Sequence, residues 1–278
     1  MPARPATRPA PRPAPRPAPP QAVLQVVERQ QITPRLVRIV AGGEGFAQFR
    51  DNDYTDKYAK LLFAAPGSGL RPPYDLAALR AESPDLLPVR RTYTIRWVDH
   101  AEAALAIDFV VHGDDGIAAP WAVAAQPGET LVLTGAGGGY APEPDADWHL
   151  LVGDHSAVPA IAQALEALPP HATGHVLLYV EHDEDRVDLG RPDGVDLSWV
   201  EPGDDDDALV AATTQLVWPA GMPHAFVHGE RGTVKRLRRH LVDERALPRD
   251  RMSISAYWAR GRGEDEFQAE KREPIGQI

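Results

Sequence analysis

The sequence predicts a two-part fold, an antiparallel β-barrel followed by an α/β domain on a parallel sheet. From residue 22 to residue 140, short segments that alternate apolar and polar residues are separated by Gly and Pro. After Pro142 and Pro144, strand-like and helix-like segments alternate instead. The 278 residues are enough for two domains, each with its own core.

The first half is expected to form half-buried antiparallel strands, because a period of two puts apolar side chains on one face. Two segments show the pattern clearly, with faces made of Leu105, Ile107, Phe109 and Val111, and of Tyr93, Ile95 and Trp97. Several such strands with Gly and Pro loops predict a small barrel. We expect a helix at 118–125 and strands at Val23–Glu28, Arg35–Val40, Tyr58–Ala64, Arg91–Val98, Leu105–His112 and Thr130–Thr134.

The second half alternates strands with amphipathic helices, which is typical of a parallel sheet with crossover helices. The expected strands are Trp148–Val152, His175–Glu181, Ala225–His228 and Met252–Trp258. The expected helices are Ser156–Leu168, Ala208–Trp218, Thr233–Ala246 and a final one at 264–271. The glycine-rich run Gly135–Gly139 is followed by prolines and no helix, so it lacks the dinucleotide-binding pattern, and we interpret it as a hinge.

Residues 1–20 are almost wholly Pro, Ala and Arg and are predicted to be a disordered leader. The barrel domain is then expected at 21–140 and the α/β domain at 141–278. A net charge of -11 argues against binding to nucleic acid. The absence of cysteine excludes disulfides and cysteine-ligated clusters. With no membrane-spanning run and no secretion signal in the sequence, we expect a cytoplasmic protein, and a monomer.

Polar or glycine-rich residues follow each predicted strand of the second half, where ligands bind in open parallel sheets. In the first half, a ligand along the strand at Arg91–Thr94 meets a guanidinium, an aromatic ring and hydroxyls. Both patterns also occur in ordinary turns, so from the residues alone a nucleotide site and a plain loop stay open alternatives. Histidine and aspartate spacings match no metal motif, so no metal site is predicted.

These segments, in this order, resemble the siderophore-interacting protein family of FAD-dependent ferric-siderophore reductases. The motifs that carry the resemblance are Arg91–Arg96, Asp108–Gly113, Gly116–Ala122, Gly135–Tyr140, Asp147–Asp154, Pro159–Ala162, His228–Glu230 and Ala256–Trp258. The resemblance covers everything except the leader. It implies a ferredoxin-reductase-like layout, in which a Greek-key antiparallel barrel binds FAD and an α/β domain binds a nicotinamide cofactor.

The resemblance also implies roles for individual residues. Those implied to bind FAD are Arg91, Thr92, Tyr93, Thr94, His112, Gly113, Gly116, Ala118, Ala119, Trp121 and Ala122. Arg91 is expected on the FAD phosphate and Thr94 near the reactive flavin nitrogen. Those implied to bind NAD(P)H are Gly153, Asp154, His155, Ser156, Glu181, Gly229 and Glu230. Where the family usually has glutamate after Gly-Asp, this chain has His155.

The implied reaction moves electrons from NAD(P)H through FAD to iron in a ferric siderophore, with ferrous iron released. Cations suited to an anionic siderophore are Lys57, Lys60, Arg260 and Arg262. Glu181 favours NADH weakly, since an acidic group suits an unphosphorylated ribose, whereas Arg186 argues for NADPH. A general flavin reductase, an electron-transfer flavoprotein and a siderophore-binding protein without catalysis stay open as alternatives.

Overall fold

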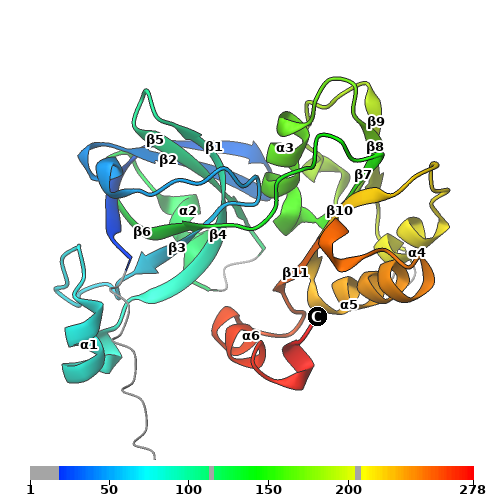
Figure 1. Cartoon of the computed structure of the whole chain (residues 1–278). Coiled ribbons are helices and arrows are strands. Elements are labelled where there is room, and N and C mark those ends of the chain that lie inside the picture. Colours follow the sequence, from blue (N-terminus) through cyan, green and yellow to red (C-terminus); the bar gives the residue numbers. More distant parts are fainter. Residues whose placement is uncertain (1–18, 113–115, 204–207) are drawn as a thin grey trace, which may run out of the picture.

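The computed structural model describes residues 19–112, 116–203 and 208–278, so nearly all of the leader lies outside the described residues. The first half is a closed antiparallel barrel, with strand order β1-β2-β5-β4-β3-β6 (Figure 1). Its strands are β1 (Gln21–Thr33), β2 (Leu36–Gly42), β3 (Tyr58–Phe63), β4 (Val89–Asp99), β5 (Ala104–Val110) and β6 (Thr130–Gly137). The short helix α2 (Ala118–Ala124) packs its buried alanines against β2 and β5.

The barrel core confirms one predicted strand face and corrects the other. Leu105, Ile107 and Phe109 are fully buried in it. In β4 the pairing with β5 shifts register between Ile95 and Trp97. Such a bulge changes which face the following residues take. Trp97 therefore packs outside the barrel against Val40, Ala104 and Ala106, and Val98 takes the inner face in its place.

Part of the glycine-rich run belongs to the barrel, so the hinge interpretation is wrong for residues 135–137, which continue β6. Gly137 pairs with Tyr58 of β3. A methyl group at Gly137 would lie 2.5 Å from the Tyr58 ring, so a larger residue would push the ring aside. Just beyond, the Asp56 carboxylate accepts hydrogen bonds from the backbone N–H groups of Gly139 and Tyr140, at 2.8 and 2.9 Å.

The second half is a five-stranded parallel sheet in the order β11-β10-β7-β8-β9 (Figure 1). Its strands are β7 (Trp148–Asp154), β8 (Thr173–Tyr179), β9 (Gly194–Val200), β10 (Pro223–Glu230) and β11 (Met252–Trp258). Helix α3 (Val158–Ala167) covers one face, and α4 (Ala208–Gln215) and α5 (Arg231–Arg239) cover the other. Helix α6 (Glu264–Glu270) follows β11. The short turns are η1 (Glu44–Gln48), η2 (Pro84–Leu86), η3 (His155–Ala157), η4 (Asp183–Asp185), η5 (His240–Glu244), η6 (Arg249–Arg251) and η7 (Pro274–Gly276).

Two elements are absent from the sequence prediction. Strand β9 directs Val195, Leu197 and Trp199 toward the face of the sheet that α3 covers. The alternation of apolar and polar residues is present in the sequence, but it is short. Helix α1 (Leu76–Glu82) buries no residue, so it has no apolar stripe to reveal it. Two predicted helices also end early: α4 stops at Gln215, and α5 gives way to the π-helical turn η5 at His240.

The barrel and the α/β domain are joined by polar contacts across their seam. The Asp185 carboxylate in η4 accepts hydrogen bonds from the Thr33 hydroxyl at 2.8 Å and from the Arg35 backbone N–H at 3.0 Å. It also pairs with the Arg35 guanidinium at 2.9 Å, and Asp185 is only 1% exposed. A second bridge joins Arg96 of β4 to Glu166 of α3 through two hydrogen bonds. No helix in the described part of the chain is long and apolar enough to cross a bilayer.

Replacing Asp185 by Asn is expected to weaken the seam, because an amide cannot accept from all three donors. We expect the free energy of unfolding, measured by urea denaturation, to fall by about 1–3 kcal/mol. Asp183→Asn is the matched control, since Asp183 lies in the same turn but its side chain is 75% exposed. The control should change stability by about 0.5 kcal/mol or less, and equal losses in the two variants would contradict this role.

The same variant gives a pH test. Burial alone would raise the pKa of Asp185, but hydrogen bonds from Thr33 and Arg35 outweigh it and lower the pKa. A lowered pKa contributes stability above the unfolded value of about 3.9, and this contribution is lost as the pH falls through the folded value. The stability gap between wild type and Asp185→Asn should therefore be full at about pH 7 and shrink below about pH 4.

Candidate functional site

A cavity of about 480 Å³ lies at the seam between the two halves. The barrel supplies Arg35, Val110, Val111 and His112 to its wall. The α/β domain supplies residues at the carboxyl ends of β7, β8, β10 and β11 and from helices α4 and α5. All of the residues predicted to bind NAD(P)H except Gly153 line this cavity: Asp154, His155, Ser156, Glu181, Gly229 and Glu230.

Asp154 joins three segments of the cavity wall. One carboxylate oxygen accepts from the backbone N–H and the hydroxyl of Ser156, at 2.9 and 2.5 Å. The other accepts from the Glu230 backbone N–H at 2.7 Å and from the Trp258 indole at 2.8 Å. Burial raises the pKa of Asp154, and these donors oppose that effect by favouring the ionised form. With four protein donors on its two oxygens, Asp154 is built to position its neighbours.

Two glycines make room for this arrangement. A methyl group at Gly153 would lie 2.6 Å from the Ala157 Cβ and 3.0 Å from the His228 carbonyl oxygen. Gly153 thus serves the packing of β7 against η3 and β10, which explains its absence from the cavity wall. Gly229 has a φ of 146°, and a methyl group there would lie 2.5 Å from an Asp154 carboxylate oxygen. A larger residue at either position would displace the strand ends that the Asp154 contacts hold together.

Glu230 caps helix α5 and reaches the segment after β11. One carboxylate oxygen accepts from the Thr233 backbone N–H at 2.9 Å, and the other accepts from the Arg260 backbone N–H at 3.2 Å. Arg260 itself lines the cavity. Its predicted companion Arg262 does not, and its guanidinium pairs with Glu270 and Glu266, at 2.7 and 3.3 Å.

His155 sits between the halves with its Nε2 atom buried and without a hydrogen-bond partner among the described residues. Burial lowers its pKa, while Asp185 and Asp154 act in the opposite direction. The imidazole is therefore neutral at physiological pH and offers one unused polar atom to a ligand in the cavity. A glutamate here would instead bring a negative charge close to Asp185, which the histidine avoids.

Glu181 lies two residues beyond the end of β8, not at the strand end as predicted. It still lines the cavity, as does Tyr179. In the sequence, Arg186 favoured NADPH where Glu181 favoured NADH. In the structure, the Arg186 guanidinium forms ion pairs with Glu201 and with Asp183, the latter at 2.7 Å.

The residues predicted to hold FAD meet on the barrel side. The Tyr93 and Phe109 rings lie 4.4 Å apart, and the Trp121 ring of α2 lies 5.8 Å from Phe109. Burial raises the pKa of Tyr93 to about 12, so it stays a neutral phenol. The remaining members are spread around them: Ala118, Ala119 and Ala122 are buried in α2, Gly116 has a φ of 89°, His112 reaches the cavity, and Gly113 lies outside the described residues.

Cations gather beside this aromatic group. The Arg91 guanidinium forms two hydrogen bonds to Asp265 of α6, at 3.0 and 3.2 Å. Lys60 contacts the Thr92 hydroxyl at 3.4 Å and lies 5.5 Å from the Tyr58 ring centre. The pKa of Lys60 is lowered by burial and then by repulsion from neighbouring cations, Arg90 and Lys271.

This donor set fits the diphosphate of FAD. A bound phosphate could take the place of Asp265, which is 79% exposed, on the Arg91 guanidinium, and the neighbouring aromatic side chains suit a planar ring system.

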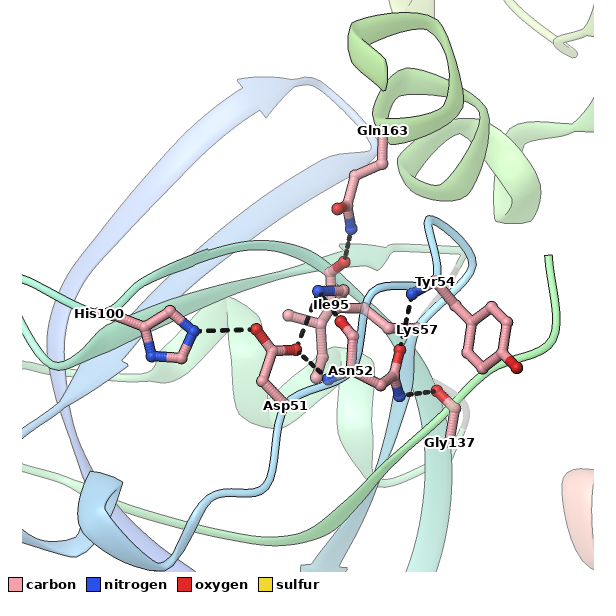
Figure 2. A network of polar contacts seen from close by, with 8 residues as sticks. All are labelled: Asp51, Asn52, Tyr54, Lys57, Ile95, His100, Gly137 and Gln163. Carbon is pink, nitrogen blue, oxygen red and sulfur yellow. Dashed lines mark hydrogen bonds and ion pairs between the residues drawn. The ribbon is translucent and has the colours of Figure 1, made fainter. Parts of the chain in front are cut away.

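Lys57 is not placed as a substrate-facing cation (Figure 2). Its ammonium donates to the Asp51 carboxylate at 2.9 Å and to the Asn52 carbonyl at 2.6 Å, and its side chain is 12% exposed. Asp51 also contacts His100 at 3.1 Å. Lys57 thus fastens the loop that leads into β3, so its predicted siderophore role has no support from its geometry.

Sequence reasoning missed the residues whose importance comes from the other half of the molecule. Thr33, Arg35 and Asp185 hold the seam, and no local pattern marks them. Tyr257 and Trp258 matched only as part of a motif, without roles. Across residues 19–112, 116–203 and 208–278, no cluster of three or more His, Asp or Glu forms a candidate metal site.

Comparison with known proteins identifies the two halves. The siderophore-interacting FAD-binding domain family matches residues 25–140, and the siderophore-interacting protein family matches residues 146–261. The chain belongs to the siderophore-interacting protein family. The resemblance inferred from the motifs is confirmed, and so is the ferredoxin-reductase-like fold with the barrel first.

Three similar proteins illustrate the family. The ferric vibriobactin reductase of Vibrio cholerae is 34% identical over 90% of this chain and 93% of its own. The NADPH-dependent ferric-chelate reductase of Escherichia coli is 32% identical over 84% of this chain and 91% of its own. The crystal structure of a siderophore-interacting protein from Aeromonas hydrophila superposes with a TM-score of 0.78 at 30% identity, covering 94% of this chain and 100% of the other.

Replacing Asp154 by Asn separates a positioning role from direct ligand contact. The new amide would face two N–H donors, so we expect the free energy of unfolding to fall by about 2 kcal/mol and nucleotide binding to weaken with it. Ser156→Ala is the control, because it removes one donor and should cost about 1 kcal/mol or less. Urea denaturation measures the stability of each variant, and equilibrium titration measures its affinity for the nucleotide. If Asp154→Asn keeps wild-type stability but loses nucleotide binding, Asp154 contacts the ligand directly.

Proposed function

We propose that this protein is an FAD-dependent reductase that moves electrons from NAD(P)H to iron held in a ferric siderophore. The observation that carries the proposal is the seam cavity, which joins His112 of the barrel to Glu181 and Glu230 at the carboxyl edge of the sheet. A nucleotide bound along that edge would meet a cofactor bound along β4. The names of the Vibrio cholerae and Escherichia coli relatives support iron chelates as the substrate class.

The chain's own groups would hold the FAD by its charged and aromatic parts. Arg91 would exchange its exposed partner Asp265 for a phosphate. Tyr93 offers a neutral aromatic surface, and Thr94 offers a hydroxyl. When bound, the flavin accepts hydride and releases electrons singly to iron.

The metal step requires no acid or base from the protein. Reduction lowers the charge on iron, which weakens its bonds to hard oxygen donors and releases it. The protein must supply positive charge beside an anionic chelate. Among the predicted cations we place Arg260 first, because it lines the seam cavity, and Lys60 second, because it lies beside the proposed FAD site. We also propose that the protein acts as a cytoplasmic monomer.

We propose NADH as the preferred donor. Glu181 faces the cavity, and Arg186, the residue that argued for NADPH, is already paired with two carboxylates. Glu181→Ala is expected to lower the ratio of kcat/KM for NADH over that for NADPH by about tenfold, the effect of one hydrogen bond to a charged group. Glu184→Ala, in the following turn, serves as the control. An unchanged ratio in Glu181→Ala would remove the basis for the preference.

The FAD site has its own test. The double substitution Arg91→Ala and Tyr93→Ala should abolish FAD binding, because it removes the guanidinium and the aromatic surface together. The α/β domain should keep its helical circular dichroism signal, since neither residue packs in its core. Arg80→Ala on α1 is the control and should retain flavin. Full flavin occupancy in the double variant would show that the site lies elsewhere.

Turnover with iron tests the proposed function itself. The purified holoprotein is mixed anaerobically with NADH and a panel of ferric siderophores, and ferrous iron is followed with a trapping dye. We expect NADH-dependent iron reduction that exceeds the rate with free flavin as acceptor. Faster reduction of free flavin than of any chelate would favour a general flavin reductase, and a colourless protein would favour binding without catalysis.

A further inference from the structure

Two tyrosine side chains lie on the glycine-rich run at the end of β6. A methyl group at Gly138 would lie 2.8 Å from the Tyr54 Cβ, just as one at Gly137 would lie 2.5 Å from the Tyr58 ring. The two glycines thus leave the space that the tyrosines occupy. Tyr54 is 44% exposed and Tyr58 is 36% exposed, so both also present surface to solvent. We call these two side chains the tyrosine platform.

Polar contacts to the loop before β3 hold the platform in place. The Asn52 side chain accepts a hydrogen bond from the Tyr54 backbone N–H at 3.0 Å and donates one to the Gly137 carbonyl at 3.3 Å. The Asp56 carboxylate accepts from the Gly139 backbone N–H at 2.8 Å. Figure 2 shows the Tyr54 ring pointing away from this network. Because the supporting backbone is already ordered, a ligand would bind to the platform with little loss of conformational freedom.

Tyr58 places the platform beside β4, the strand proposed to carry the flavin. It pairs directly with Thr94, and Lys60 pairs with Thr92. Directly opposed residues of antiparallel strands point to the same face of the sheet. Ala59, which lies between Tyr58 and Lys60 on β3, is buried in the barrel core, so this face is the outer one. Tyr58 and Lys60 therefore share an outer surface with the side chains of Thr92 and Thr94.

A positive charge lies beside the platform. The Lys60 ammonium is 5.5 Å from the centre of the Tyr58 ring. Within the described residues no carboxylate forms an ion pair with Lys60, whereas Lys57 is paired with Asp51. Lys60 therefore has charge to offer to an anionic ligand, and the neighbouring ring offers an apolar face to the same ligand.

This combination fits one class of iron chelate. In catecholate and phenolate siderophores, the oxygens that bind iron are attached to a benzene ring. A single donor group of this kind brings both a ring face for the tyrosines and negative charge for Lys60. Hydroxamate siderophores also bring negatively charged oxygens, but their donor groups have no aromatic ring. The charge alone would accept both classes, and the two tyrosines favour the first.

We propose that the tyrosine platform and Lys60 form a binding site for ferric siderophores with aromatic donor groups, and that the two tyrosines select these chelates over hydroxamates. The inference rests on the proposed function and names its substrate class. The site contributes binding and selectivity, and it brings the chelate to the strand where the flavin is proposed to lie.

The test measures binding separately from electron transfer. The holoprotein is titrated with the gallium(III) complexes of catechol and of acetohydroxamate, because gallium(III) keeps the ligand arrangement of ferric iron without accepting an electron. Tyr54→Leu and Tyr58→Leu remove the rings, alone and together. The matched control is the double variant Tyr54→Phe and Tyr58→Phe, which keeps both rings and removes only the hydroxyls. Tyr74→Leu, in the loop before α1, controls for the loss of a tyrosine elsewhere. FAD content is measured in every variant.

We expect the wild type to bind the catechol complex more tightly than the hydroxamate complex. Each Leu substitution should weaken binding of the catechol complex about fivefold, the effect of one aromatic pair, and leave binding of the hydroxamate complex unchanged. The Phe double variant and Tyr74→Leu should match wild type. Lys60→Gln should weaken binding of both complexes, because it removes charge and leaves the rings in place.

Equal affinity of the wild type for the two complexes would overturn the inference, and so would Leu variants that bind both as the wild type does or lose both to the same degree. Should Tyr58→Leu lose FAD, Tyr54→Leu alone makes the same comparison from outside the barrel strands, where wild-type selectivity would count against the platform. These results leave the proposed function intact. A holoprotein that shows the expected selectivity for gallium complexes but reduces no ferric chelate would instead refute the proposed function and support the binding site.

Discussion

The docking of the barrel onto the parallel sheet is the constraint on which the rest of the molecule depends. Asp185 of the α/β domain stabilises this docking, because its buried carboxylate accepts hydrogen bonds from Thr33 and Arg35 of the barrel. The seam cavity, with walls from both halves, exists only in that arrangement. So does the hydrogen bond from the Gln163 side chain of α3 to the Ile95 carbonyl of β4. Docking thus forms the cavity as well as the contacts that hold the two halves together.

Within the α/β domain, the carboxyl edge of the sheet is organised around Asp154. Its side chain faces inward and gathers Ser156, Glu230 and Trp258, so that their remaining groups face the cavity. Asp154, which the resemblance implies as a nucleotide contact, therefore also supports its neighbours. Gly229 belongs to the same arrangement, because its missing side chain makes room for that carboxylate.

The sequence predicted the barrel, the parallel sheet and the composition of the strand ends, because these follow from local periodicity and turn residues. The prediction failed where contacts between segments distant in the sequence decide the position of a side chain. The bulge at β4 sends Trp97 outside the barrel, and a register shift has no signature in alternation alone. Lys57 was predicted to face an anionic siderophore, yet its ammonium pairs with Asp51 and stabilises the loop that leads into β3. Asp185 has no distinguishing pattern in the sequence because its partners lie about 150 residues away.

A flavin at the seam that passes electrons from a nicotinamide to chelated iron would link these features into one mechanism. The most direct measurement follows the two half-reactions separately on the holoprotein without oxygen. NADH should bleach the flavin absorbance, and a ferric siderophore added after NADH is consumed should restore it. Flavin that stays oxidised with NADH, or that stays bleached with every ferric chelate, would be incompatible with this mechanism.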